Sequence, residues 1–279
     1  MRAPLAWLPT GLRYLTMALI ALALLLPLYW MLISSLRPSD EIFRYAADFG
    51  WRTFVPESLT LEHWIGALDA GYLRAIGNSL FVAFSTVALG ILVNSLAGFA
   101  FAVFDFPGRT VLFVCVLASF MMPFEAMVLP LYHLVRFLGW TDSYKALIMP
   151  EVASGFIIFL FRQFFVGIPK ELFEAARIDG ATWWQAYWRI AMPLTGPTIA
   201  TASLMLFILQ WEAFFWPLVA ASAPDYVVVQ VAIARHSNLE TTDWGGMFAA
   251  SSIAVLMALI PFLAFQRYYV RTIVQSGIK

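Results

Sequence analysis

The first long apolar run decides what class of protein this chain can form. No charged residue occurs from Tyr14 to Leu36, and about 20 apolar residues let a helix cross a bilayer. The run exceeds the apolar region of about 7 to 15 residues in a signal peptide, so we expect a retained first membrane helix. Of all residues 62% are hydrophobic, whereas about half of a soluble domain is apolar. The sequence therefore predicts an integral membrane protein.

Further apolar runs predict an all-α membrane domain with six transmembrane helices. Each run is expected to be helical because a backbone inside the bilayer must satisfy its own hydrogen bonds. The fourth run is the weakest, since it is short and carries Pro150 and Glu151. The expected spans, within a single domain of residues 1–279, are 14–36, 75–104, 110–135, 146–166, 194–219 and 244–266.

The distribution of basic residues predicts which ends of these helices face the cytoplasm. Lys and Arg outnumber Asp and Glu in the short loops that this arrangement places on one side of the membrane. Short basic loops stay in the cytoplasm, so we expect both termini inside and the long mixed loop from Arg37 to Arg74 outside. The formal net charge is zero, and the overall balance therefore indicates neither nucleic acid nor another charged partner.

The segment from Pro169 to Pro197 is rich in charge although apolar runs enclose it. Glu174 favours the N-terminal half of a helix. Gly180 can end that helix because glycine adopts the left-handed conformation without strain. Thr182 with Gln185 three residues later reads as a capping box that starts a second short helix. We predict a helix, a sharp turn and a helix that stand out from the membrane between the fourth and fifth spans.

This segment resembles the EAA loop of the membrane subunits of ATP-binding-cassette (ABC) importers. A Met at position 192 replaces the usual Leu before the proline. The resemblance implies that the loop at 169–189, with Arg177 and Asp179, docks on a cytoplasmic ATPase subunit and carries its motion into the membrane. The alternative is an interfacial amphipathic helix that matches by accident. The matching positions are Glu174, Ala175, Ala176, Gly180, Ile190 and Pro193.

The resemblance covers most of the chain and is closest to the carbohydrate importer permeases of the maltose-system type, in particular the shorter of the two permease partners. Each further stretch is short, but their order and spacing agree with that branch. They are Asn78-Ser79-Leu80, Phe106-Pro107-Gly108-Arg109, Leu129-Pro130-Leu131-Tyr132 and Trp216-Pro217-Leu218.

That branch implies a set of partners and a location. It implies a second, non-identical permease, two ABC ATPase subunits and an extracytoplasmic solute-binding protein, with membrane lipid around the helices. The chain has no GxxxxGK[ST] phosphate loop, so ATP and Mg²⁺ are expected in the partner ATPases and no cofactor in this chain. The expected location is the cytoplasmic membrane of a prokaryote, and the expected solute is a sugar or sugar derivative.

Four residues are candidates for the translocation path. Glu212 follows Trp211 where the family commonly carries Asn, and an ionisable residue at membrane depth usually faces the bundle interior or a cavity. The alternative for Glu212 is a carboxyl hydrogen-bonded to a neighbouring helix. Asn94 can equally serve packing between helices, and Glu125 can reach the membrane interface.

Three other classes of function compete with this reading. An intramembrane enzyme has little support, because His63, His133 and His236 lie far apart without an HExxH pair and no nucleophile turn is present. We therefore expect neither catalytic nor metal-binding residues. A proton-coupled transporter could use Glu125, Glu151 and Glu212, but it has no need of the charged loop. An ABC permease for an amino acid, peptide or metal remains open.

Overall fold

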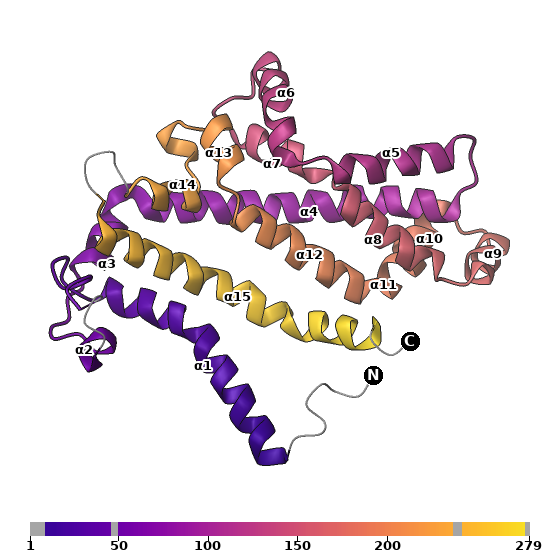
Figure 1. The fold of residues 1–279 in the computed structure, drawn as a ribbon. Helices are drawn as coiled ribbons and strands as arrows, with labels where there is room; N and C mark the ends of the chain where they lie inside the picture. Colours follow the sequence, from indigo (N-terminus) through magenta and orange to yellow (C-terminus); the bar gives the residue numbers. More distant parts are fainter. Residues whose placement is uncertain (1–8, 46–49, 237–241, 277–279) are drawn as a thin grey trace. The chain divides into compact units, whose positions relative to one another are not determined.

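A computed structural model describes residues 9–45, 50–236 and 242–276, the side chains of 69–70 and 265–276 excepted. The described residues contain helices and no strand, which confirms the all-α class (Figure 1). The elements are α1 (Thr10–Ser35), α2 (Trp51–Phe54), α3 (Glu62–Ala67), the π-helix η1 (Leu68–Tyr72), α4 (Leu73–Val103), α5 (Arg109–Met121), α6 (Phe124–Phe137), α7 (Tyr144–Val152), α8 (Gly155–Val166), α9 (Lys170–Ile178), α10 (Trp183–Ala186), the π-helix η2 (Tyr187–Ala191), α11 (Met192–Leu194), α12 (Gly196–Trp211), α13 (Phe215–Ala220), the 3-10 helix η3 (Pro224–Tyr226), α14 (Val229–Ala234) and α15 (Trp244–Ser276).

Three helices in the described part are long and apolar enough to cross a bilayer. They are α1, α4 and the stretch Trp244–Ala264 of α15. Three bent pairs pass the same test together: α5 with α6 at 104°, α7 with α8 at 41°, and Trp183–Leu194 with Gly196–Trp211 at 81°. Counting each bent pair as one span gives up to six, by length and composition.

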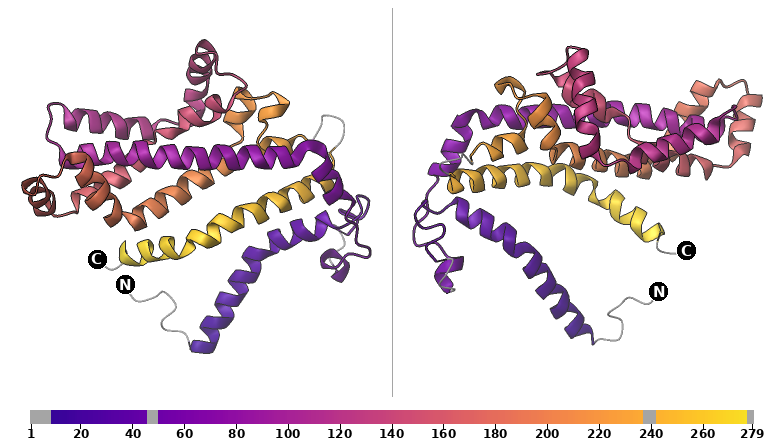
Figure 2. Two further views of the ribbon diagram at one scale, coloured as in Figure 1. Left: turned by 180° about the vertical axis from the view of Figure 1, so that it is seen from behind. Right: turned by 45° about the horizontal axis from the view of Figure 1, so that its top comes forward.

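The bends fall where the sequence interrupts the helical hydrogen-bond ladder. The expected span at 110–135 is two helices, because Pro123 has no N–H and pushes the preceding Met122 into an extended conformation (φ −74°, ψ 128°). Figure 2 shows the sharp turn between α5 and α6 in magenta. The expected span at 194–219 is interrupted at residues 212–214, between the end of α12 at Trp211 and the start of α13 at Phe215.

The chain forms two compact units. The first contains residues 1–73 and 233–256, and the second contains residues 74–232 and 257–279. In the first unit, buried Arg37 follows α1 and donates from Nη2 to the carbonyl oxygens of Arg52 and Thr53 at 3.0 and 2.9 Å. The Tyr72 hydroxyl donates to the Ala250 carbonyl at 2.6 Å. The expected long loop is thus tied to both α1 and α15.

In the second unit, α4 presents a face of small residues to its neighbours. Gly90, Asn94 and Gly98 are four residues apart and so share one face. A Cβ on Gly98 would lie 2.7 Å from the Phe161 Cβ, and a Cβ on Gly90 would lie 2.9 Å from the Leu206 side chain. Small residues at these positions let α8 and α12 approach α4 closely, as membrane helices commonly pack.

The Asn94 side chain hydrogen-bonds to the backbone at the break between α7 and α8. Its Nδ2 donates to the Val152 carbonyl at 2.8 Å and to the Gly90 carbonyl at 2.7 Å. The Ser154 N–H donates to Asn94 Oδ1 at 2.8 Å. The side chain is fully buried. It therefore satisfies backbone groups that a break inside a bilayer would otherwise leave unpaired.

The first turns of α4 hold the segment that follows α13. Asn78 Nδ2 donates to the Val227 carbonyl at 2.9 Å, and the Tyr144 hydroxyl donates to Asn78 Oδ1 at 2.8 Å. The Val229 N–H donates to Ser79 Oγ at 2.8 Å. These bonds connect α4, α7 and the start of α14 at one end of the second unit.

We predict that Gly98→Ala destabilises the protein and that Gly77→Ala does not. The new Cβ at Gly98 meets Phe161 at 2.7 Å, and overpacking of this kind costs about 1–3 kcal/mol. A Cβ on Gly77, also in α4, would meet no atom of another element within 4 Å, so alanine there only improves helix propensity. Thermal unfolding in detergent measures both variants. A melting temperature for Gly98→Ala at or above that of Gly77→Ala would contradict the close packing.

Candidate functional site

The helix α9 is the centre of the candidate site. Pro169 precedes it with φ −54° and ψ 130°, Glu171 lies in its first turn and Arg177 in its last. An acid at the N-terminal end and a base at the C-terminal end both stabilise the helix through its dipole. A nine-residue helix is marginal by itself in water, so contacts with the rest of the unit must hold it.

The turn after α9 has the geometry that the sequence predicts. Gly180 has φ +84°, in the left-handed region. The Ala181 N–H donates to the Ala176 carbonyl at 2.9 Å and the Gly180 N–H to the Arg177 carbonyl at 3.1 Å, the two bonds of a Schellman motif. Arg177 Nη1 also donates to the Ala181 carbonyl at 2.7 Å. The turn direction is therefore fixed by backbone and side chain together.

The predicted capping box starts the second helix, α10. The Gln185 N–H donates to Thr182 Oγ1 at 3.2 Å, and the Thr182 N–H donates to Gln185 Oε1 at 2.8 Å. Both residues thus satisfy backbone donors that the helix start leaves unpaired.

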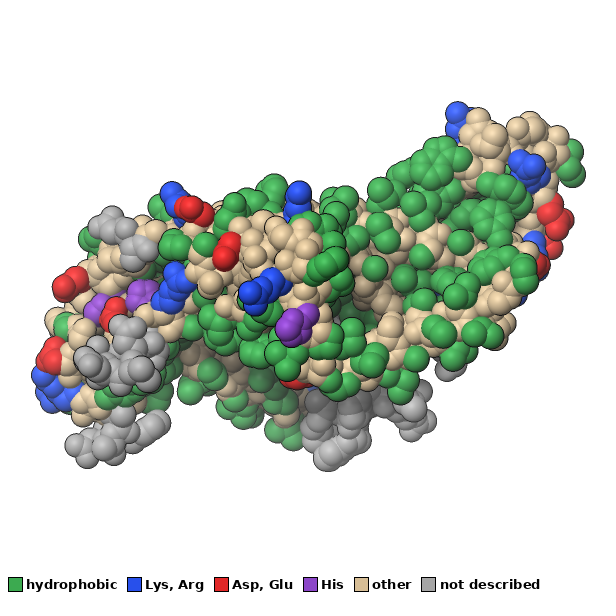
Figure 3. Space-filling view, turned by 90° about the horizontal axis from the view of Figure 1, so that it is seen from above, with side chains coloured by type: hydrophobic (Ala, Val, Ile, Leu, Met, Phe, Trp, Pro, Cys, Tyr) green, Lys and Arg blue, Asp and Glu red, His purple; other side chains and the backbone are tan. Residues whose placement is uncertain are grey.

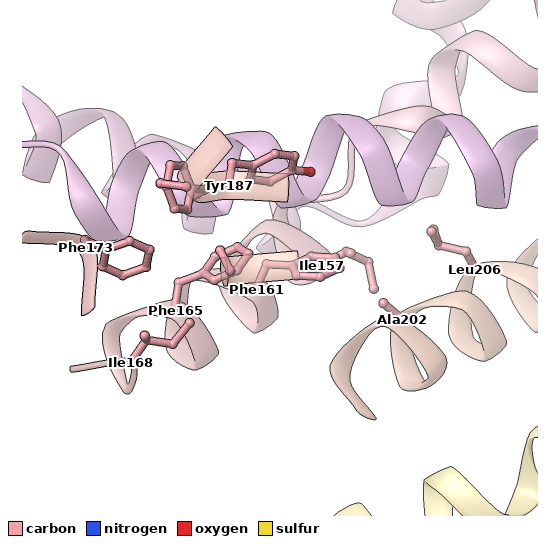
Figure 4. Packing of buried hydrophobic residues seen from close by; sticks show 11 residues of the cluster. Ile157, Phe161, Phe165, Ile168, Phe173, Tyr187, Ala202 and Leu206 are labelled. Atoms are coloured by element: carbon pink, nitrogen blue, oxygen red, sulfur yellow. The ribbon is translucent and has the colours of Figure 1, made fainter. Parts of the chain in front are cut away.

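Phe173 anchors α9 from its inner face. Its side chain is 5% exposed, and its ring lies 5.8 Å from the ring of Phe99 on α4. Phe99 also contacts Phe165 of α8 at 5.6 Å and Tyr187 of η2 at 5.4 Å between ring centroids. Figure 4 shows Phe173, Phe165 and Tyr187 in this buried cluster. We call Phe99 and these three rings the aromatic hub. Through it α9 is fixed to α4 and α8.

The outer face of α9 is uncovered. Ile178 is 86% exposed and Leu172 is 45% exposed, and Glu174 and Ala175 are exposed with them. Figure 3 shows charged side chains gathered at the end of the molecule that carries α9, next to a largely hydrophobic surface. An apolar patch rimmed by charges on a rigidly held helix is suited to docking against another protein.

A small cavity lies behind α9. Its volume is about 250 Å³, and residues from the ends of α4 and α8, from α9 and from α10 line it.

A cation–π contact holds the last turn of α9. The Arg177 guanidinium lies 5.3 Å from the ring centroid of Trp183, and the Trp183 and Phe104 ring centroids are 5.0 Å apart. Trp183 therefore connects the last turn of α9, through the cation–π contact, to Phe104 directly after α4.

The structure brings together part of the expected EAA residues. Glu174 and Ala175 lie on the exposed face of α9, and Ala176 is half-buried. Ile190 instead packs against the buried cluster around the hub, and Pro193 is exposed in α11. The first half of the motif thus forms a surface, whereas Ile190 supports the loop from within.

The four candidate path residues do not form one site. Glu212 is exposed and directly follows α12, whereas Trp211, the last residue of α12, is buried and stacks on Phe207 with centroids 5.7 Å apart. Glu125 is exposed in the first turn of α6, and Asn94 is buried in α4. Within the described residues no hydrogen bond or ion pair joins any two of the four. The contacts of Asn94 give it the packing role that the sequence also allowed.

Two residues that hold the loop in place, Tyr187 and Ser95, were not among the site residues predicted from the sequence. The Tyr187 hydroxyl lies 2.7 Å from Ser95 Oγ, and both side chains are buried. The sequence signal for this contact was a serine within an apolar span, since such a hydroxyl commonly hydrogen-bonds to another helix.

The described residues hold no cluster of three or more His, Cys, Asp or Glu side chains suited to a metal ion.

The fold and the loop define a helical membrane protein with an exposed amphipathic helix, α9. Residues 87–275 match the family described as binding-protein-dependent transport system inner membrane component. The chain therefore belongs to this family, the permease subunits of ABC importers.

Relatives with known names match this chain over nearly their whole length. The chain is 34% identical to the arabinooligosaccharides transport system permease protein AraQ of Halalkalibacterium halodurans, over 99% of this chain and 97% of the relative. It is 30% identical to the lactose transport system permease protein LacG of Rhizobium radiobacter, over 96% of each. It is 32% identical to the sn-glycerol-3-phosphate transport system permease protein UgpE of Escherichia coli, over 94% and 95%.

Solved structures show the same fold. A chain in the crystal structure of a bacterial ABC transporter involved in alginate import superimposes with a TM-score of 0.80. The superposition covers 92% of this chain and 95% of that one, at 21% identity. The arrangement of helices is therefore shared although most residues differ.

We predict that Phe173→Ala loosens α9 and that Leu172→Ala does not. Truncating a buried Phe costs about 3–5 kcal/mol, and the Phe173 ring is what fixes α9 to Phe99. Leu172 is exposed on the same helix. Hydrogen exchange of the amides in 170–178 should speed up in Phe173→Ala alone. Equal exchange rates in the two variants would show that the hub does not hold this helix.

Proposed function

We propose that this chain is a permease subunit of an ATP-driven importer and that the outer face of α9 docks on a separate ATPase subunit. The observation that carries this proposal is the exposure of Ile178, Leu172 and Ala175 on a helix whose other face is fixed by Phe173. A helix with exposed apolar anchors and a charged rim suits docking into a groove of a partner.

The aromatic hub would transmit a displacement of α9 to the membrane helices. Because Phe99 contacts rings from α8, α9 and η2, a push on α9 acts directly on α4 and α8. Packed interiors transmit such displacements because they do not compress. Closure of two ATPase subunits would then rock this bundle and that of a second, non-identical permease between inward-open and outward-open states.

The remaining partners follow from the family and from the missing phosphate loop. ATP and Mg²⁺ bind the partner ATPases, since this chain carries no GxxxxGK[ST] motif. An extracytoplasmic binding protein delivers the solute. A second structural neighbour, with a TM-score of 0.57, is a bacterial alginate ABC transporter in complex with an alginate-bound periplasmic protein. The permease lies in the cytoplasmic membrane of a prokaryote, with α9 and both termini in the cytoplasm.

The proposed solute is a sugar or sugar derivative. Arabinooligosaccharides and lactose appear in the names of two relatives, and sn-glycerol-3-phosphate in that of a third. The proposed path passes Glu212, whose exposed carboxylate at the break after α12 can accept hydrogen bonds from hydroxyl groups. An ABC permease for a non-sugar solute is the competing assignment.

We predict that Glu174→Lys and Gly180→Asp abolish ATPase binding without preventing membrane insertion. The first reverses a charge on the docking face, and the second strains the left-handed turn that aims α9. Co-purification of the ATPase with the tagged permease measures docking. Glu62→Lys, a charge reversal in α3, is the control and should retain the ATPase. Normal ATPase recovery with both loop variants would contradict the docking role.

The proposed orientation can be tested by labelling. In a Cys115→Ser background, a cysteine at Ala181, in the turn between α9 and α10, should react with a membrane-impermeant maleimide only after the membrane is opened. A cysteine at Ser39, exposed after α1, should react in intact cells. Labelling of the Ala181 position from outside would show that the topology is the reverse of the proposed one, and would contradict the proposed contact with a cytoplasmic ATPase.

We predict that Glu212→Ala lowers uptake of a labelled oligosaccharide while assembly with the partner subunits is unchanged. The substitution removes an exposed carboxylate that has no ion-pair partner among the described residues. Glu57→Ala, in the segment between α2 and α3, is the control and should leave uptake unchanged. Unaltered kinetics in Glu212→Ala would exclude a path role. Uptake of a labelled amino acid or peptide in place of oligosaccharide would favour the competing solute class.

A further inference from the structure

A buried hydrogen bond joins the loop at 169–189, which we call the coupling loop, to α4. Tyr187 belongs to η2, directly after α10, and its hydroxyl lies 2.7 Å from Ser95 Oγ on α4. The Tyr187 side chain is 1% exposed and Ser95 is fully buried. Figure 4 shows Tyr187, with its oxygen in red, in the buried cluster. This polar contact therefore sits where water cannot replace it.

The direction of this hydrogen bond follows from the proton count. Ser95 Oγ also donates to the carbonyl of Ile91 and lies 3.2 Å from that of Leu92. A serine hydroxyl has a single proton, and that proton serves the carbonyl groups. Tyr187 is therefore the donor to Ser95. Removing the Tyr187 hydroxyl leaves Ser95 satisfied, whereas removing the Ser95 hydroxyl leaves a buried tyrosine donor without an acceptor.

The residue next to Ser95 holds the bend between α7 and α8. Asn94 bonds to Val152 at the end of α7 and to Ser154 at the start of α8, both at 2.8 Å. The two helices meet at 41° with two residues between them. Adjacent positions on α4 thus bind the loop on one side and the bend on the other.

We propose that Tyr187 is a positioning residue of the coupling step. Through Ser95 it fixes the coupling loop to α4 at the level where Asn94 holds the α7–α8 bend, so that displacement of α9 changes the bend. The inference rests on the proposed docking of α9 to an ATPase. The aromatic packing of the hub resists compression, and a hydrogen bond in an apolar environment adds a strong and directional contact.

The test uses the complex purified with its partner subunits in lipid vesicles. A bimane fluorophore is attached to a cysteine at Ala153, an exposed residue in the bend, in the Cys115→Ser background. The change in bimane emission on adding ATP and Mg²⁺ reports movement of the bend. The variants are Tyr187→Phe, Ser95→Ala and their combination. Tyr132→Phe, which removes a phenolic hydroxyl from α6, is the matched control.

Tyr187→Phe and Ser95→Ala should keep the ATPase subunits bound while the ATP-induced emission change falls about threefold to tenfold, the range set by one net hydrogen bond. Tyr132→Phe should respond as the unsubstituted complex does. A full response in Tyr187→Phe, or no response in the unsubstituted complex, would overturn the inference. Loss of the ATPase from the unsubstituted complex would instead refute the proposed docking.

The double variant separates positioning from stability. Ser95→Ala strands a buried donor and should lower the melting temperature, and adding Tyr187→Phe should restore it, because removing both partners of a buried hydrogen bond is nearly neutral. The emission change should stay reduced in the double variant. Recovery of the emission change together with the melting temperature would show that the bond only satisfies buried groups.

Discussion

The contact between Phe173 and Phe99 is the interaction on which the site depends. A helix as short as α9 is marginal in water, so its direction comes from the ring buried in the hub and from the turn at Gly180. The Phe173 ring lies on the buried side of the helix, whereas the turn at Gly180 is exposed. Because the inner side is fixed, the exposed Ile178 and Leu172 present a surface of constant shape to a partner.

The membrane part of the structure obeys a second constraint, which is that every break in a helix needs a substitute hydrogen-bond partner. The break between α7 and α8 is satisfied by Asn94. Gly90 and Gly98 let the neighbouring helices come close enough for that side chain to reach. The same face of α4 thus combines close packing with backbone satisfaction, and Ser95 extends it to the coupling loop.

The sequence was most informative where structure is local. The helix end at Gly180 and the capping box of Thr182 and Gln185 depend on residues a few positions apart. The run at 110–135 contains Pro123, which marks where the helix breaks, but the angle of 104° between α5 and α6 is set by packing that the run does not show. The break at 212–214 has no proline or glycine in it, so the run at 194–219 gave no sign of it. Asn94 shows the same limit, since its partners lie on elements about 60 residues further along the chain. The family could be predicted because the residues that resemble its loop lie within one continuous stretch, residues 174–193.

The central claim is that the outer face of α9 touches a nucleotide-hydrolysing subunit. A photo-crosslinking amino acid at Ile178 in the complete transporter tests this contact directly, with the same group at Leu129, 70% exposed on α6, as the comparison. The account predicts an adduct with the ATPase from position 178 and none from position 129. Adducts with lipid alone from position 178, in a complex that still hydrolyses ATP, would contradict it.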